Sequence, residues 1–337
     1  MAKQKSLLLI FILFIKTLYA QYGGQTIFAF LDYPNSPRIA ALGGMNVSIY
    51  DKDLSLAENN PALIDSSLNN YIYLNYSSFV AGIKTGYLSY AIDAKKFGTF
   101  ATGIKYINYG TFTQADEQGN ITGKFTANEL ALNIIWAISI DTQVVFGVNV
   151  KPIYSHLYKY ISTGIAADLG LFYHSKDYLT GIGIVLKNIG TQIKTYVPQN
   201  KEQLPFDIAL GFSQKLKHAP FRFSLTAHYL NKFNLLYQTY NRAKIWDYGE
   251  NLLRHLIFGV EIIPSKFFYA DIGFNYKRHQ EMHIQGLLGS PGFNFGLGIK
   301  LYNISINYSF SKYYVAANMN NFSLTFNISQ ILTRKNK

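Results

Sequence analysis

The sequence has no cysteine, few charged residues and, past its first twenty residues, no long apolar run. The absence of cysteine excludes a disulfide framework and thiolate metal sites. Charged residues make up only 15% of the chain, against about 25% in an average soluble domain. No run after residue 20 reaches the roughly 18 apolar residues that a transmembrane helix needs, although the mean hydropathy is +0.04. High apolar content without such runs is typical of a transmembrane β-barrel, whose lipid-facing residues are spread one in two.

Sequence motifs of common enzymes are missing as well. The chain has no GxSxG elbow and no HExxH helix motif, and its seven histidines are scattered. His279 and His283 flank Glu281 in one expected loop. A polar, solvent-exposed loop is a simpler interpretation of these residues than a metal site. His255 and Ser224 fall near neighbouring expected strands, but such pairs arise often by chance. We therefore predict a protein that is not an enzyme and uses no cofactor or metal.

Residues 1–20 are typical of a secretory signal peptide. Lys3 and Lys5 form a basic start, the apolar core follows from Leu7 to Ile15, and cleavage after Ala20 is expected. Loss of this segment removes three lysines and no acidic residue, which lowers the net charge from +12 to +9. A basic exported protein suits anionic lipid headgroups or lipopolysaccharide as partners, whereas export argues against nucleic acid.

From Tyr71 to the end, apolar and polar residues alternate with period two. Residues 129–140 show the pattern most clearly, with Ile135 as the exception on the face of small and polar residues. A soluble β-sandwich would also alternate, but here the polar face consists mainly of Gly, Ala, Asn, Ser and Thr, which suits a narrow lumen. About fourteen strands are expected, and their connections alternate between short turns and longer loops such as residues 110–125 and 231–252. That asymmetry predicts an all-β, antiparallel outer-membrane barrel over residues 71–337, in the bacterial outer membrane.

Residues 21–70 break this pattern and are expected to form a hatch, or plug, with short helices. Residues 39–42 have helical spacing, and Gly43 and Gly44 then supply the left-handed conformation with which helices end. Asn60 and Pro61 suit the cap and first position of a second short helix. The residues that define this hatch signature are Leu42, Gly43, Gly44, Asp51, Asp53, Asn60 and Pro61.

The hatch segment resembles the N-terminal signature of the FadL-like barrel superfamily. The matching features are the alanine-rich run that ends in Leu-Gly-Gly at residues 40–44, the acidic pair Asp51 and Asp53, and Asn-Pro-Ala at residues 60–62. Within this superfamily the chain is most similar to the PorQ family of the type IX secretion system of Bacteroidetes. The runs that carry this similarity are residues 106–110, 187–193 and 215–222.

The resemblance implies a barrel without catalytic activity that anchors a PorZ-like surface protein of the attachment complex. In that complex a partner sortase processes secreted cargo and joins it to lipopolysaccharide. Loop 231–252 is rich in aromatic residues, a composition common where protein partners bind. Its candidate partner residues are Tyr237, Tyr240, Trp246 and Tyr248. The alternative is a FadL-like transport channel for hydrophobic small molecules. A gap or kink in the wall and an apolar lumen would favour this alternative.

Overall fold

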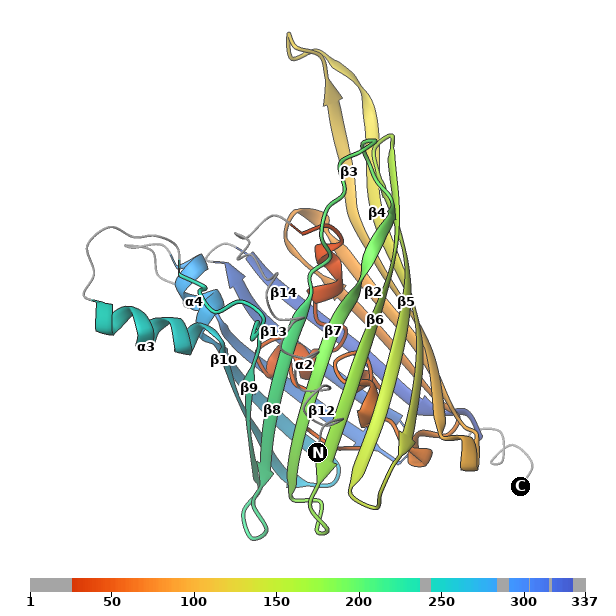
Figure 1. Cartoon of the computed structure of the whole chain (residues 1–337), viewed down its shortest axis with the longest axis vertical. Coiled ribbons are helices and arrows are strands. Elements are labelled where there is room, and N and C mark those ends of the chain that lie inside the picture. The colour runs from red at the N-terminus through yellow and green to blue at the C-terminus, as the bar shows by residue number, and fades with distance from the viewer. Residues whose placement is uncertain (1–25, 237–243, 284–290, 303, 315–316, 330–337) are drawn as a thin grey trace, which may run out of the picture.

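A closed antiparallel barrel encloses the hatch in the computed structural model, which describes residues 26–236, 244–283, 291–302, 304–314 and 317–329 (Figure 1). Each strand pairs with its neighbours in sequence, and β1 pairs with β14 to close the barrel. The prediction of an all-β barrel of about fourteen strands is confirmed. The strands are β1 (Tyr71–Ser78), β2 (Lys84–Asp93), β3 (Thr99–Ala115), β4 (Ile121–Ser139), β5 (Val144–Leu157), β6 (Tyr160–His174), β7 (Thr180–Lys194), β8 (Asp207–Lys215), β9 (Phe221–Ala227), β10 (Leu256–Ser265), β11 (Phe268–Asn275), β12 (Phe293–Leu301), β13 (Ile304–Tyr314) and β14 (Ala317–Asn327).

Short helices build the hatch and lie in connections between strands. In the hatch these are η2 (Ala29–Asp32), α2 (Pro37–Ala41), η3 (Leu54–Leu56), η4 (Pro61–Leu63) and η5 (Ser66–Leu68). Two single turns, η6 (Val80–Gly82) and η7 (Lys95–Phe97), connect strands, and α3 (Lys244–Arg254) and α4 (Tyr276–Met282) lie in connections of the longer-loop end. Throughout the described part of the chain, every helix is too short or too polar to cross a membrane.

The helix expected at residues 39–42 is present as α2, which begins two residues earlier at Pro37 and ends at Ala41. The hydroxyl of Ser36 accepts a hydrogen bond from the amide of Ile39 at 3.1 Å and caps α2. Gly43 and Gly44 both have φ of +102°, the left-handed region that ends this helix at little steric cost. Asn60 caps η4 by accepting from the amide of Ala62 at 3.0 Å, with Pro61 at its first position.

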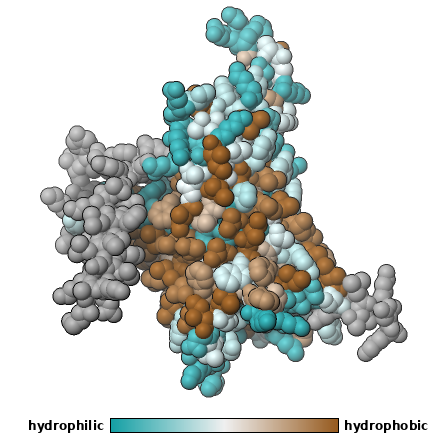
Figure 2. All heavy atoms as spheres, turned by 45° about the vertical axis from the view of Figure 1, so that its right-hand side comes forward, coloured by the Kyte–Doolittle hydropathy of each residue, from teal (hydrophilic) through white to brown (hydrophobic). Residues whose placement is uncertain are grey.

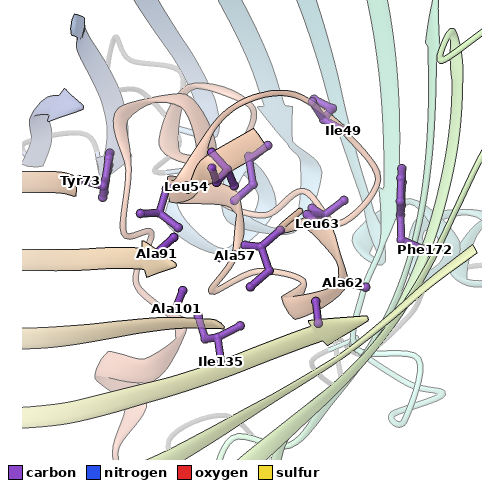
Figure 3. Close-up of a cluster of buried hydrophobic side chains, with 14 of the residues drawn as sticks. Ile49, Leu54, Ala57, Ala62, Leu63, Tyr73, Ala91, Ala101, Ile135 and Phe172 are labelled. Carbon is purple, nitrogen blue, oxygen red and sulfur yellow. The ribbon is translucent and has the colours of Figure 1, made fainter. Parts of the chain in front are cut away.

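The two faces of the barrel wall differ as the alternation predicts. Large apolar side chains point outward, and Figure 2 shows them as a hydrophobic band between hydrophilic ends. Ile134, for example, is 49% exposed on this outer face, whereas its neighbour Ile135 is fully buried inside. Ile135 departs from the polar inner pattern because it packs in the main apolar cluster between hatch and wall, together with Leu63 and Ala101 (Figure 3).

Glycines in the wall make room for the hatch backbone. A Cβ atom at Gly147 would collide with Pro61 and Ala62, and one at Gly183 would collide with the carbonyl of Val47. Glycines at these inward positions of the strands therefore let the hatch backbone approach the wall closely.

The wall is tall on one side and low on the other. Strands β3 to β7 have 14 to 19 residues, whereas β8 to β12 have 7 to 10. A transmembrane strand needs about 9 to 11 residues, so the strands of the low wall are no longer than a bilayer requires, and the tall wall rises beyond them (Figure 1).

The predictions of two loops were wrong in part. The loop expected at residues 110–125 is mostly paired, because β3 and β4 continue to the pair Ala115 and Ile121. Its threonines, isoleucine and phenylalanines favour strand, which explains the extension. His279 and Glu281 lie on α4 rather than in a loop, because Asn275 caps a helix by accepting from the amide of Arg278 at 2.9 Å.

Candidate functional site: a step in the barrel wall

The wall drops abruptly between β7 and β8. Their pairing runs from Thr180 with Gln214 to Lys187 with Asp207, where β8 begins. Strand β7 continues for seven more residues, 188–194, which pair with β6 alone. The upper part of β7 is therefore an unpaired strand edge where the tall wall meets the low wall at β8. The other side of the tall wall has a comparable edge on β3, which continues past its last pair with β2, Asn108 with Lys84.

A bulge bends β7 at the foot of this step. Lys187 and Asn188 are consecutive, yet both side chains are buried toward the lumen. Asn188 has φ of +57°, and its amide donates to the carboxylate of Asp168 on β6 at 2.7 Å. The register between β6 and β7 shifts at this point. Bulges of this kind re-aim a strand and end pairing.

Asn188 joins the step to the hatch and to the loop that crosses it. Its side-chain amide donates to the carbonyl of Pro205 at 2.9 Å and to the carboxylate of Asp32 at 3.4 Å. Its carbonyl oxygen accepts from Lys151, which also forms an ion pair with Asp168 at 2.7 Å. One residue therefore connects the tall wall, the hatch and the start of the low wall.

A groove of about 540 Å³ lies beside the unpaired edge of β7. Its apolar lining includes Ile189, Leu204 and Phe206, and its rim carries Lys201 and Glu202. The loop on its far side is attached to the start of the hatch, where the amide of Ile27 donates to the carbonyl of Gln203 at 2.9 Å. Movement of this part of the hatch would therefore move the groove wall.

On the lumen side of the step lies a smaller, polar cavity of about 90 Å³. Asp32, Lys187 and Asp207 are among its lining residues. Burial raises the pKa of Asp32, and nearby Lys187 partly offsets this. Burial also lowers the pKa of His228, at the cavity edge, to about 3, with Lys277 and His255 adding to the shift. An apolar lumen, which the transport alternative would favour, is not found at this cavity.

At the opposite end of the hatch, ion pairs hold it to the low wall. Arg38 of α2 is 2% exposed and binds Asp51 at 2.8 Å, Asp53 at 3.0 Å and Glu261 of β10 at 2.7 Å. Arg222 of β9 binds Glu261 at 2.8 Å. Burial alone would raise the pKa of Asp51, but Arg38, Lys300 and Arg222 outweigh burial and hold this pKa well below its usual range.

The signature residues of the hatch thus have structural roles that the structure makes explicit. Asp53 binds Arg38 and also caps η3 by accepting from the amide of Ser55 at 3.0 Å. Leu42 and Asn60 are buried, the first in the apolar cluster and the second against the carbonyl of Val47, to which it donates at 2.9 Å.

The residues proposed for partner binding are only partly described. Tyr237 and Tyr240 lie outside the described residues. Trp246 and Tyr248 belong to α3, and Tyr248 is 69% exposed. These positions remain a prediction.

The weak enzyme and metal candidates do not come together. The Nδ1 of His255 donates to the carbonyl of His228 at 2.8 Å, and Ser224 donates to the carbonyl of Gly259. His279 lies against the carbonyl of Pro291 at 2.9 Å. Within the described ranges, no group of three metal-ligating side chains is arranged to hold an ion.

Sequence reasoning missed the charged residues of the lumen. Lys105, Lys151, Asp168 and Glu261 all lie at inward positions of their strands. These residues could have been found from the sequence, because each is a charged residue on the strand face that otherwise carries small and polar residues. A charged residue buried on that face needs a partner. Lys105 finds this partner in Glu58 of the hatch at 2.7 Å.

Comparison with known proteins agrees with this architecture. No family model matches the chain, and no curated protein matches its sequence. The toluene transporter TbuX of Ralstonia pickettii superposes with a TM-score of 0.54 at 12% identity, over 89% of this chain and 98% of that one. The toluene transporter TodX of Pseudomonas putida superposes with a TM-score of 0.54 at 12% identity, over 87% of this chain and 96% of that one. A FadL homologue of Pseudomonas aeruginosa superposes with a TM-score of 0.50 at 10% identity, over 87% of this chain and 98% of that one.

The chain has the fold of the FadL-like outer-membrane barrels. At these identities the likeness establishes the fold alone. As in that fold, the hatch lies inside the barrel, and the taller strands rise on the side of the longer loops (Figure 1).

Proposed function

We propose that the protein is a non-enzymatic outer-membrane channel for hydrophobic small molecules, which pass between the barrel and the outer leaflet at the wall step. The observation that carries this proposal is the 540 Å³ groove beside the unpaired edge of β7. The likeness to channels for toluene and other monoaromatic hydrocarbons supports the same class of cargo.

Asn188 is the residue that closes the step in this proposal. Its hydrogen bonds to Pro205 and Asp32 hold the foot of the groove against the hatch. An apolar molecule occupies the groove against Ile189 and Leu204, and passage inward requires the bonds of Asn188 to open. The polar cavity behind them makes the interior a barrier to apolar molecules while the hatch is in place.

The test is to fill the groove. Thr191 lines it and is exposed, so Thr191→Trp is expected to abolish uptake of a fluorescent fatty acid or monoaromatic probe into proteoliposomes. Thr113→Trp, at an exposed position of β3 beyond the membrane, is the matched control and should leave uptake unchanged. Uptake that survives Thr191→Trp in a correctly folded protein contradicts the proposal.

A second candidate is the anchoring of a PorZ-like partner in the type IX secretion system. The specific observation in its favour is the β3–β4 hairpin, which stays paired as far as Ala115 with Ile121 and projects beyond the barrel (Figure 1). The rings of Phe112 and Phe125 stack on it with centroids 5.2 Å apart, and Tyr158 of the β5–β6 connection lies against Phe125 at 4.9 Å. A rigid platform with exposed rings suits a protein partner.

The same end of the wall suits an anionic lipid surface. Lys124, Lys159 and Lys194 are exposed there, where lipopolysaccharide would offer phosphates and carboxylates.

Purification in mild detergent followed by mass spectrometry separates the two candidates. A stoichiometric surface protein that is lost when residues 111–125 are removed, or when residues 231–252 are shortened, supports anchoring. Removal of 111–125 leaves β3 and β4 paired up to Asn108 and Asn128 and so keeps the barrel intact. Co-purified apolar small molecules that are lost in Thr191→Trp support the channel instead.

A further inference from the structure

A second cavity opens at the other end of the barrel, among the short turns that an outer-membrane barrel directs to the periplasm. It measures about 190 Å³, room for several waters at about 30 Å³ each. Its lining joins the hatch to five strands, β8 to β12, and to one turn of the low wall. The charged lining residues are Arg38, Asp51, Lys215, Arg222, Lys266 and Lys300.

Positive charge is in excess at this cavity. Five cationic side chains line it, and only one carboxylate, that of Asp51, does so. Asp53 and Glu261 lie behind Arg38, and Asp271 faces Glu261 on the next strand. Even with all four carboxylates ionised, the five cations leave a positive balance.

Two of the lysines lack an acidic partner. In the described part of the chain, no carboxylate lies within 4.0 Å of the ammonium group of Lys215 or Lys266, whereas Lys300 reaches Asp51 at 3.8 Å. Tyr269 orders the floor of the cavity, since its ring lies 5.2 Å from the Arg38 guanidinium and 5.3 Å from the Lys300 ammonium.

The strand register adds an independent observation. Lys215 of β8 and Arg222 of β9 are direct cross-strand partners, and both lie on the inward face. Like charges directly opposite one another destabilise a sheet. An anion between them would turn this repulsion into attraction.

We infer that this cavity binds a phosphoryl group, held by Lys215, Lys266 and Lys300 at the mouth and by Arg222 deeper in. Guanidinium and ammonium groups are the usual partners of phosphate oxygens. The same chemistry is offered by soluble phosphate and by the headgroup of an inner-leaflet phospholipid. Because Arg222 and Lys300 also bind Asp51 of the hatch, the bound anion ties the low wall to the hatch. This site does not depend on what passes through the barrel.

Phosphate binding is tested on the full-length protein in detergent, by calorimetric titration with inorganic phosphate against chloride of equal ionic strength. The double variant Lys215→Gln with Lys266→Gln should bind phosphate about tenfold or more weakly. The control, Lys96→Gln with Lys176→Gln, removes two lysines from short turns at the same end but outside the cavity and should bind as the wild type does.

A parallel titration with short-chain phosphatidylglycerol below its micellar concentration identifies the source of the anion. If only this lipid binds, the anion is a lipid headgroup; if inorganic phosphate binds, the anion is a soluble ligand. In either case the cavity variant must lose the binding. Ser265→Glu places a carboxylate at the exposed rim and should block binding even if the double variant fails to fold. No saturable binding to the wild type, or equal loss in cavity and control variants, overturns the inference.

Discussion

The tall and low walls hold the same hatch by different physical means. The hatch contacts the tall wall through apolar side chains and through close approach of its backbone. Leu63, for example, packs with Ala101 and Ile135 in one apolar cluster. Against the low wall it adds buried charge, chiefly Arg38 with Glu261, to close contacts such as that of Leu42 with Gly273. The tall wall has a single ion pair of this kind to the hatch among the described residues, Lys105 with Glu58.

This difference bears on which side of the hatch is able to release. Apolar packing has no pH dependence of its own and is short-ranged, whereas buried ion pairs are sensitive to protonation and to competing ions. The wall step lies where the two kinds of attachment meet, at Asn188. We therefore expect the hatch to stay with the tall wall and to part from the low wall when it moves.

The largest effect is expected from breaking the low-wall attachment. Arg38→Met leaves Asp51, Asp53 and Glu261 without their shared partner, and breaking a buried pair in this way costs about 3–5 kcal/mol. The urea midpoint should fall, and protease should cut the hatch sooner. Lys52→Met, at an exposed position of the same hatch, should change neither.

The tall-wall attachment is tested by two neighbouring isoleucines of β4. Ile135→Ala opens a cavity against the hatch and should cost about 2–4 kcal/mol in the free energy of unfolding. Ile134→Ala removes the same atoms from the lipid-facing side, where lipid fills the space, and should cost far less. Equal losses in the two variants would show that the hatch does not pack on the tall wall.

A smaller effect is expected from crowding the same contact. Gly147→Ala drives a methyl group into the backbone of Pro61 and Ala62 and should cost about 1–3 kcal/mol, as overpacking usually does. Gly123→Ala on β4, whose added methyl would meet only the side chain of Gln114 at 3.7 Å, is the control. The comparison is read from denaturant midpoints, and an unchanged midpoint for Gly147→Ala would contradict the close approach.

Acid should loosen the low side gradually. The pKa of His228 is lowered to about 3 in the folded protein, so the unfolded chain takes up its proton first as the pH falls below about 6.5. The contribution of His228 to stability then declines by at most about 1.4 kcal/mol per pH unit down to about pH 3. Asp32, whose pKa is raised by burial, contributes in the opposite direction. The lowered pKa of Asp51 adds a second loss below about pH 4. His228→Gln should flatten the first decline, and an identical pH profile would refute its assignment.

Much of this architecture can be predicted from the sequence, because alternation and turn chemistry are local. The strand number, the end of α2 at Gly43 and the cap at Asn60 all follow from residues close in the chain. The step at Asn188 cannot be predicted in this way. It depends on where β8 begins relative to β7 and on a bulge opposite Asp168, which are properties of pairing between distant residues.

The charged lumen is a similar case. The partners of Arg38 lie 13, 15 and 223 residues away in sequence, and only the closed barrel brings Glu261 to it. Sequence reasoning found the acidic pair Asp51 and Asp53 as a signature but not the arginine that they bind.

The most direct test of the central claim is uptake of an apolar fluorescent probe into proteoliposomes by Asn188→Ala beside the wild type. We expect faster uptake in the variant, because the bonds to Pro205 and Asp32 that close the step are lost. Adding Thr191→Trp to this variant should stop uptake again. Uptake unchanged in Asn188→Ala, or insensitive to the added tryptophan, would contradict passage at the wall step.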